Sequence, residues 1–165
     1  MDLVMELLKA VRIDFRPKAA PPRLSRVALA TVVAIVGSLL ADALIVRGAI
    51  ALFPKTAHYA HFQFADYAKL TIIGVVGACL GWPILARISS APRWVYLRAA
   101  VAVTVVLLLP DVYLLVLGQP ADAVAALMVM HLAIAVVTYQ AMVRLAPLGP
   151  NRSTDGAAAP RRRAS

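Results

Sequence analysis

Residues 99–117 read AAVAVTVVLLLPDVYLLVL, an apolar run in which Asp111 is the only Asp, Glu, His, Lys or Arg. A helix needs about 20 mostly apolar residues to cross the hydrocarbon core of a bilayer. Three further runs of this kind lie at 27–46, 70–86 and 123–143. The sequence therefore predicts an all-α integral membrane protein, a bundle of four membrane-spanning helices.

The composition of the whole chain supports this fold class. Hydrophobic residues make up 62% of the 165 residues, and the mean hydropathy is +0.81, whereas soluble domains are about 45–50% apolar. This length leaves room for a four-helix domain at 26–144, an N-terminal segment at 1–25 and a C-terminal tail at 145–165. Cys79 is the only cysteine, so no intrachain disulfide can form.

The two flanks differ in character. Apolar residues recur at helical spacing within residues 3–11, which predicts a short amphipathic helix lying on the membrane surface. Pro17, Pro21 and Pro22 are expected to end this helix. Alternatively, its apolar face docks a partner protein. The tail at 145–165 is rich in alanine and arginine and is predicted to be disordered.

Positive charge predicts the orientation in the membrane. All but three of the 17 Lys and Arg residues lie before the first run, between the second and third, or after the fourth; the exceptions are Arg47, Lys55 and Lys69. Because Lys and Arg accumulate in cytoplasmic loops, both termini and the middle loop are predicted to be cytoplasmic in a bacterial inner membrane. The net charge of +9 is interpreted as contact with anionic lipids, not nucleic acid.

Within the four runs, polar or small residues recur at spacings that return to nearly the same helix face. These stripes are Thr31, Ser38 and Asp42; Gly74, Gly77 and Gly81; Thr104 and Asp111; His131 and Thr138. Glycines let a neighbouring helix approach closely, so the second stripe is interpreted as a helix-packing face. The simplest assembly turns all four stripes inward.

Asp42, Asp111 and His131 are predicted to form one polar cluster. At 1.5 Å per residue, each lies about 20–24 Å from the basic residue at the cytoplasmic end of its helix, which places all three in the outer half of the membrane. The outer mouth adds four charged residues, of which the basic ones are possible counter-charges: Arg47, Asp66, Lys69 and Asp122. Pro110 is expected to kink the third helix and free a carbonyl for the cluster.

Two interpretations of this cluster are open. An ionisable side chain at the membrane centre costs about 2.5–3.5 kcal/mol on insertion scales, so such residues are usually functional or tightly paired. The cluster would then be a proton relay, or a site for a small cation or polar ligand. Alternatively, it is a structural contact that fixes helix register, worth about 0.6 kcal/mol per hydrogen bond. Structural contact is slightly favoured for Asp42, whereas Asp111 with His131 stays open.

The sequence gives little indication of a metal site or of catalysis. His58 and His61 are spaced to meet on one helical face, but a metal would need a third ligand, for which Asp66 is the nearest, and headgroup contacts are favoured. The chain lacks a Ser-His-Asp spacing, a phosphate-binding glycine loop and a paired-cysteine motif. No catalytic residue, cofactor or metal site is therefore predicted, and a non-enzymatic role is expected.

The sequence also carries a family resemblance. Residues 107–111 (LLLPD), followed by 128–132 (MVMHL), resemble a family of small four-span bacterial membrane proteins of unknown function. GVVGA at 74–78 and the arginine-containing stretch before the third run fit the same pattern. The resemblance covers 26–144, implies the four-helix fold and singles out Pro110, Asp111 and His131. It implies no activity.

Two classes of function follow. The favoured one is an accessory or scaffold subunit of a membrane complex, whose partner is another membrane protein or a second copy of the chain. The other is a small transporter or sensor of protons, cations or polar solutes that uses Asp111 and His131. In both, the lipid bilayer is a partner and nucleic acid is not.

Overall fold

The computed structural model describes residue 6 and residues 19–57 and 59–149, so the predicted N-terminal amphipathic helix, apart from residue 6, and residues 150–165 of the predicted C-terminal tail lie outside the described residues. The elements are α2 (Leu24–Leu52), η1 (Pro54–Thr56), η2 (Ala60–Phe62), α3 (Phe64–Ile88), α4 (Pro92–Val116) and α5 (Ala121–Leu145). Each of the four α-helices is long and apolar enough to cross a membrane. This part of the chain contains no strand, which confirms the all-α class.

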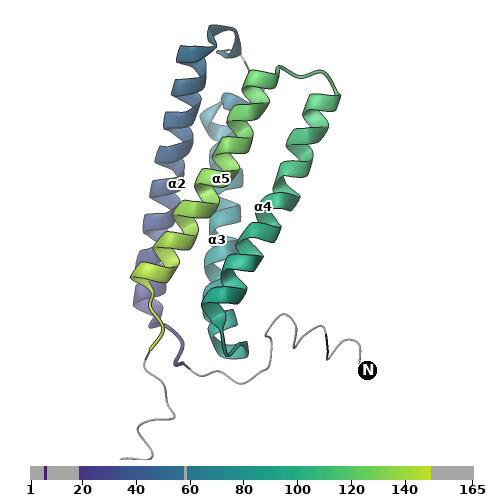
Figure 1. Ribbon diagram of the computed structural model, residues 1–165. Helices are drawn as coiled ribbons and strands as arrows, with labels where there is room; N and C mark the ends of the chain where they lie inside the picture. Colours follow the sequence, from purple (N-terminus) through teal and green to yellow (C-terminus); the bar gives the residue numbers. More distant parts are fainter. Residues whose placement is uncertain (1–5, 7–18, 58, 150–165) are drawn as a thin grey trace, which may run out of the picture.

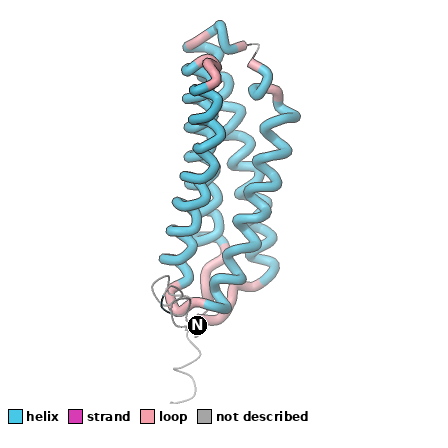
Figure 2. The backbone as a smooth tube through the Cα atoms, turned by 90° about the vertical axis from the view of Figure 1, so that its right-hand side faces the viewer, coloured by secondary structure: helices cyan, strands magenta, loops and turns pink. Residues whose placement is uncertain are grey.

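The four helices run side by side, with connections only at the two ends (Figures 1 and 2). The start of α2, the end of α5 and the α3–α4 connection lie together, and we call this the termini end. The η1–η2 segment and the α4–α5 turn lie at the opposite end, which we call the loop end. Because all connections are short, consecutive helices are antiparallel neighbours.

The helices extend beyond the apolar runs of the sequence. α3 begins at Phe64 and α4 at Pro92, several residues before the runs at 70–86 and 99–117. The added turns carry charged residues such as Asp66 and Arg93. Hydropathy marks only the part of a helix that suits the hydrocarbon core, whereas the hydrogen-bonded helix continues into the headgroup region.

Both tight connections have local sequence causes. Gly118 follows the end of α4 with a φ of 77°, a conformation that costs glycine little. The N–H of Gln119 donates to the Leu114 carbonyl at 3.1 Å, as in a Schellman motif that ends a helix. Between α3 and α4, Ser89 Oγ accepts the N–H of Ala91 at 3.0 Å, and Pro92 then begins α4.

The most extensive contact in the bundle is between α2 and α5. Small side chains make this possible, because Ala30, Ala34 and Ser38 recur every fourth residue on the buried face of α2. A Cβ added at Gly37 would lie 3.0 Å from Val137 Cγ1. Gly37 is therefore the glycine at which two helices approach closely.

The predicted packing role of Gly74, Gly77 and Gly81 is wrong within this chain. A Cβ added at any of these positions would meet no atom within 4 Å. α3 instead buries Thr71, Trp82 and the other residues of that face. The reason is that buried hydroxyl and indole groups need protein partners in lipid, whereas a glycine loses little by facing it. Three of the four stripes thus turn inward, and the glycine stripe does not.

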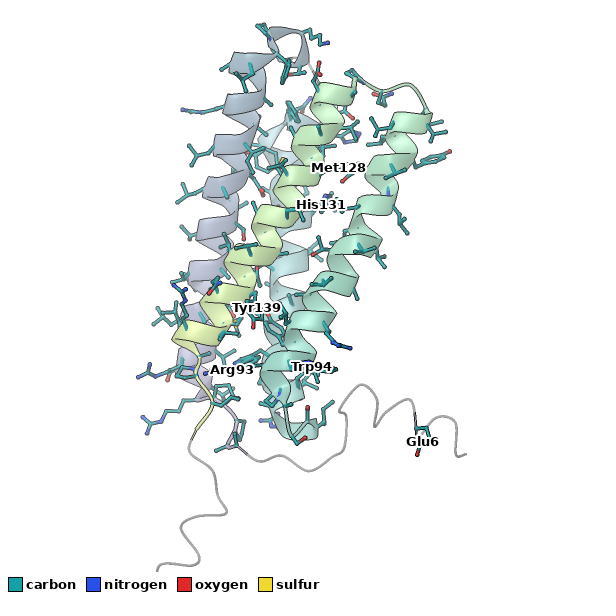
Figure 3. The ribbon with its side chains drawn as sticks, in the orientation of Figure 1. Glu6, Arg93, Trp94, Met128, His131 and Tyr139 are labelled. Carbon is teal, nitrogen blue, oxygen red and sulfur yellow. The ribbon has the colours of Figure 1, made fainter. Side chains whose placement is uncertain are left out.

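An aromatic cluster fills the termini end of the bundle. The fully buried Trp82 donates its Nε1–H to the carbonyl of Ala146 at 2.8 Å. Its ring lies 5.1 Å from Tyr96, which stacks on Tyr139 at 5.7 Å. These rings belong to the core of the bundle. Trp94, beside the cluster, carries the guanidinium of Arg98 over its ring at 3.7 Å (Figure 3).

The two glycine environments give a direct stability prediction. Gly37→Val is expected to lower the free energy of unfolding by about 1–3 kcal/mol, because the added atoms overfill the α2–α5 contact. Gly77→Val is the matched control and should change it by less than about 0.5 kcal/mol, since the position faces open space. Thermal unfolding of both variants in the same detergent measures this. Equal losses in the two variants would contradict the assigned packing faces.

Candidate intramembrane polar site

The central contact of the candidate site joins α4 to α5. His131 Nδ1 and Asp111 Oδ2 are 2.9 Å apart, with side-chain exposures of 28% for His131 and 5% for Asp111. His131 lies on the side of α5 that faces α4 (Figure 3). The hydrogen bond forms with either a neutral or a protonated imidazole, and protonation converts it to an ion pair. The structure therefore brings together the two residues whose role the sequence left open.

A second contact joins α2 to α3. Thr71 Oγ1 donates to Asp42 Oδ2 at 2.7 Å, and the Asp42 side chain is fully buried. Asp42 is also close enough to His131 for their charges to interact. The three predicted residues thus lie in one neighbourhood contributed by all four helices, and we call Asp42, Thr71, Asp111 and His131 the loop-end site. Thr71 was missed because it stands outside the glycine stripe that drew attention to its helix.

The η1–η2 segment adds aromatic groups beside this site. Tyr59 packs edge-on against His61 and Phe62, with ring centroids 5.3 Å apart in each pair. Burial raises the pKa of Tyr59, and the nearby negative charge of Asp111 raises it further. The charge of His61 also reaches Asp111. The closeness of Tyr59 to Asp111 is visible only in the folded structure, since nothing in the spacing of residues 53–63 places Tyr59 next to α4.

The charged residues predicted at the outer mouth do not form the ion pairs that the sequence suggested. Asp122 pairs with Lys55 at 2.6 Å, not with Arg47 or Lys69 as the sequence suggested. The cause is the continuation of α2 to Leu52, which carries η1 to the start of α5. The side chains of Arg47, Asp66 and Lys69 are exposed and contribute no counter-charge inside the loop-end site.

The remaining predicted positions are placed as follows. Pro110 lies inside α4, is exposed, and the helix continues through it to Val116. His61 is exposed, and His58 lies outside the described residues, so their proposed pairing stays a prediction. In the part of the chain that is described, no three His, Cys, Asp or Glu residues are arranged to hold a metal ion.

Two buried hydroxyl groups lie deeper in the bundle. Ser38 is fully buried and Thr138 is 3% exposed, and neither hydroxyl has a hydrogen-bond partner among the described residues. Both stand next to the close approach of α2 and α5, because the residues that precede them, Gly37 and Val137, are the pair in close contact. Ser38 stands at the middle of α2, one turn below Asp42.

Comparison with known proteins adds a family. No curated protein and no solved structure is similar enough to this chain to match it. A family described as "Family of unknown function (DUF6069)" matches residues 16–147, which include all four helices and every residue of the loop-end site. Because this match covers most of the chain, the protein belongs to that family of unknown function.

Proposed function

We propose that this protein is a proton-responsive membrane sensor whose loop-end site faces the outside of a bacterial inner membrane. The four apolar helices make it a multi-pass membrane protein. The observation that carries the proposal is the 2.9 Å contact of His131 with Asp111 between two helices. Histidine is the side chain whose charge changes most readily near neutral pH. No enzymatic step is proposed.

Charge distribution supports this orientation. Six arginines mark the termini end of the helices: Arg23, Arg26, Arg87, Arg93, Arg98 and Arg144. Three basic residues mark the loop end, and one of them, Lys55, is paired with Asp122. Under the tendency of basic residues to stay cytoplasmic, the loop end faces outward.

Few side chains of α4 are buried in the bundle, and this explains how a proton on His131 could change the position of the helix. Beyond Tyr96, the only buried side chains of this helix are Thr104 and Asp111. Thr104 donates to the carbonyl of Ala100 in its own helix, so Asp111 makes the polar contact that ties this half of α4 to α5. Protonation of His131 strengthens the attraction to Asp111 and holds α4 against the bundle for a larger share of the time.

The groups that surround His131 set the strength of this response. Asp111 faces it from α4, Asp42 interacts with it from α2, and Thr71 of α3 holds the Asp42 carboxylate. Within the connection, His61 acts on Asp111 through its charge, and Asp111 in turn acts on Tyr59. A proton on the imidazole would turn its contact with Asp111 into an ion pair.

Proton sensing is favoured over passive proton conduction because an apolar core fills the bundle between the polar residues and the termini end. The termini-end core consists of Val27, Ala30, Ala34, Val75, Cys79, Trp82, Tyr96, Ala141, Met142 and Ala146. Such a packed apolar layer leaves no row of polar groups to carry a proton across. We therefore expect liposomes containing the protein to hold an imposed pH gradient as long as empty liposomes do.

The test measures the position of α4 directly. Spin labels are placed at exposed positions of α4 and α2, Leu109 and Val32, in a Cys79→Ala background in lipid nanodiscs. The distance distribution is expected to shorten between about pH 8 and pH 5, the range in which histidine titrates. His131→Gln should abolish this shift, and His61→Gln, the matched control, should retain it. A shift that persists in His131→Gln, or its absence in the labelled parent, would refute the proposal.

A role as an accessory or scaffold subunit is the second candidate, and the exposed glycines favour it. Gly74 and Gly77 are exposed on α3 with open space in front of them, a face that suits close contact with another helix. The predicted partner is another membrane protein or a second copy of this chain. Gly77→Leu should then remove a stoichiometric partner in mild detergent, whereas Gly48→Leu, at another open glycine, should not. Equal retention in both variants counts against this role.

A further inference from the structure

We propose a sodium-class cation site between α2 and α5, formed by Asp42 Oδ1, Ser38 Oγ and Thr138 Oγ1. This site shares Asp42 with the loop-end site but uses neither Asp111 nor His131 as a ligand. The three atoms come from fully or almost fully buried side chains. None of them has a hydrogen-bond partner in the described parts of the chain.

Unsatisfied buried oxygens are costly. A buried polar group without a partner costs about 1–3 kcal/mol, and lipid offers no water to compensate it. Two other hydroxyls, in α2 and α4, avoid this cost: Thr31 donates to the carbonyl of Val27 at 2.9 Å, and Thr104 to that of Ala100 at 2.8 Å. Ser38 and Thr138 do not, so their oxygens remain available to a ligand.

The three oxygens converge by their positions on the helices. Ser38 and Asp42 are four residues apart on one face of α2, which makes them neighbours. Thr138 stands beside Ser38 on α5, since the residues that precede the two, Val137 and Gly37, meet there. Thr71 occupies Oδ2 of Asp42 and leaves Oδ1 for another partner.

The chemistry of these atoms selects the ligand. Carboxylate and hydroxyl oxygens are hard donors that suit alkali and alkaline-earth cations. One carboxylate balances one positive charge, whereas a divalent ion would leave an uncompensated charge inside the membrane. The close approach of the two helices at Gly37 restricts the available space and favours Na⁺ over the larger K⁺.

The test compares ions by thermal unfolding of the purified protein in detergent. Chloride salts of Na⁺, K⁺ and choline are used at equal ionic strength. With Na⁺ about tenfold above its Kd, the Tm is expected to rise by about 3–6 °C relative to choline. K⁺ is expected to give a smaller rise. A Tm that is the same in Na⁺ and choline would overturn the proposal.

Matched variants assign the effect to the site. Ser38→Ala and Thr138→Val remove one hydroxyl each and should abolish the difference between Na⁺ and choline, while the Tm in choline stays close to that of the parent. Thr31→Val removes a hydroxyl that is already used within its own helix and should retain the difference. A Na⁺ effect that is equal in all four proteins would show that these oxygens hold water only.

A further variant separates this site from the proposed sensor. His131→Gln should keep the Na⁺ effect while losing the pH-dependent movement of α4. Loss of the Na⁺ effect in His131→Gln would contradict two distinct sites. Binding of radioactive ²²Na⁺ to the parent and to Thr138→Val supplies a readout independent of unfolding, and equal binding to both would exclude the Thr138 hydroxyl as a ligand.

Discussion

Trp82→Ala is expected to lower the free energy of unfolding by about 3–5 kcal/mol, the largest loss at any single position of the bundle. Trp82 is fully buried, so its removal leaves a cavity within the termini-end core. It also leaves the Ala146 carbonyl without the indole donor that lies 2.8 Å away. Equilibrium unfolding in mixed detergent micelles, followed by far-ultraviolet circular dichroism, measures the loss.

Two variants serve as controls for this prediction. Trp82→Phe retains a ring against Tyr96 but removes the donor, so we expect a loss of about 1–3 kcal/mol. Trp94→Ala removes the ring below Arg98, a cation–π contact worth about 0.5–1 kcal/mol at an exposed site. An equal loss in Trp82→Ala and Trp94→Ala would mean that the aromatic cluster does not form the core of this end.

The second large effect concerns the contact between α4 and α5. Asp111→Leu is expected to destabilise the protein by about 1–3 kcal/mol, because His131 is left partly buried without its hydrogen-bond partner. The double variant Asp111→Leu with His131→Leu should regain most of this loss, since apolar replacement of both members of a buried polar pair is often neutral or stabilising. Both variants should lose the pH response of α4.

A double-mutant cycle quantifies the contact. The single variants Asp111→Leu and His131→Leu, with the double variant and the parent, should give a coupling of about 0.5–3 kcal/mol, the range for residues in direct contact. A coupling near zero would contradict a direct Asp111–His131 interaction. A double variant that is stable yet insensitive to pH would show that the pair is retained for its response to protons and not for folding.

The spans could be predicted from the sequence because apolar runs of this length have few alternatives in water or lipid. The approach of Asp111 to His131 could also be anticipated, since spacing and depth together limit where two polar side chains can meet. Spacing alone could not say which face of α3 turns inward. Either the face with Gly77 or the face with Thr71 could turn toward the bundle. The hydrogen bond of Thr71 to Asp42 favours the face with Thr71. A signal for the tight α2–α5 contact was present in the recurrence of Ala30, Ala34 and Ser38.

Other features depend on the fold as a whole. The pairing of Asp122 with Lys55 follows from where α2 ends, and apolar runs do not determine a helix end within several residues. Tryptophan is common at the membrane interface, so composition alone does not place Trp82 in the core. Its burial depends on the Ala146 carbonyl lying within reach at the end of another helix, and such a contact cannot be read from either segment alone.

The protonation of His131 in lipid bilayers can be measured by ¹⁵N solid-state NMR. His58 and His61 are replaced by glutamine, which leaves His131 as the only histidine of the three. The imidazole signals are expected to change from neutral to cationic as the pH outside falls from about 8 to 5, and Asp111→Asn should change these signals, because the carboxylate that contacts Nδ1 is removed. An imidazole that keeps one charge state over the whole range, with the same spectrum in Asp111→Asn, would contradict a proton-responsive pair.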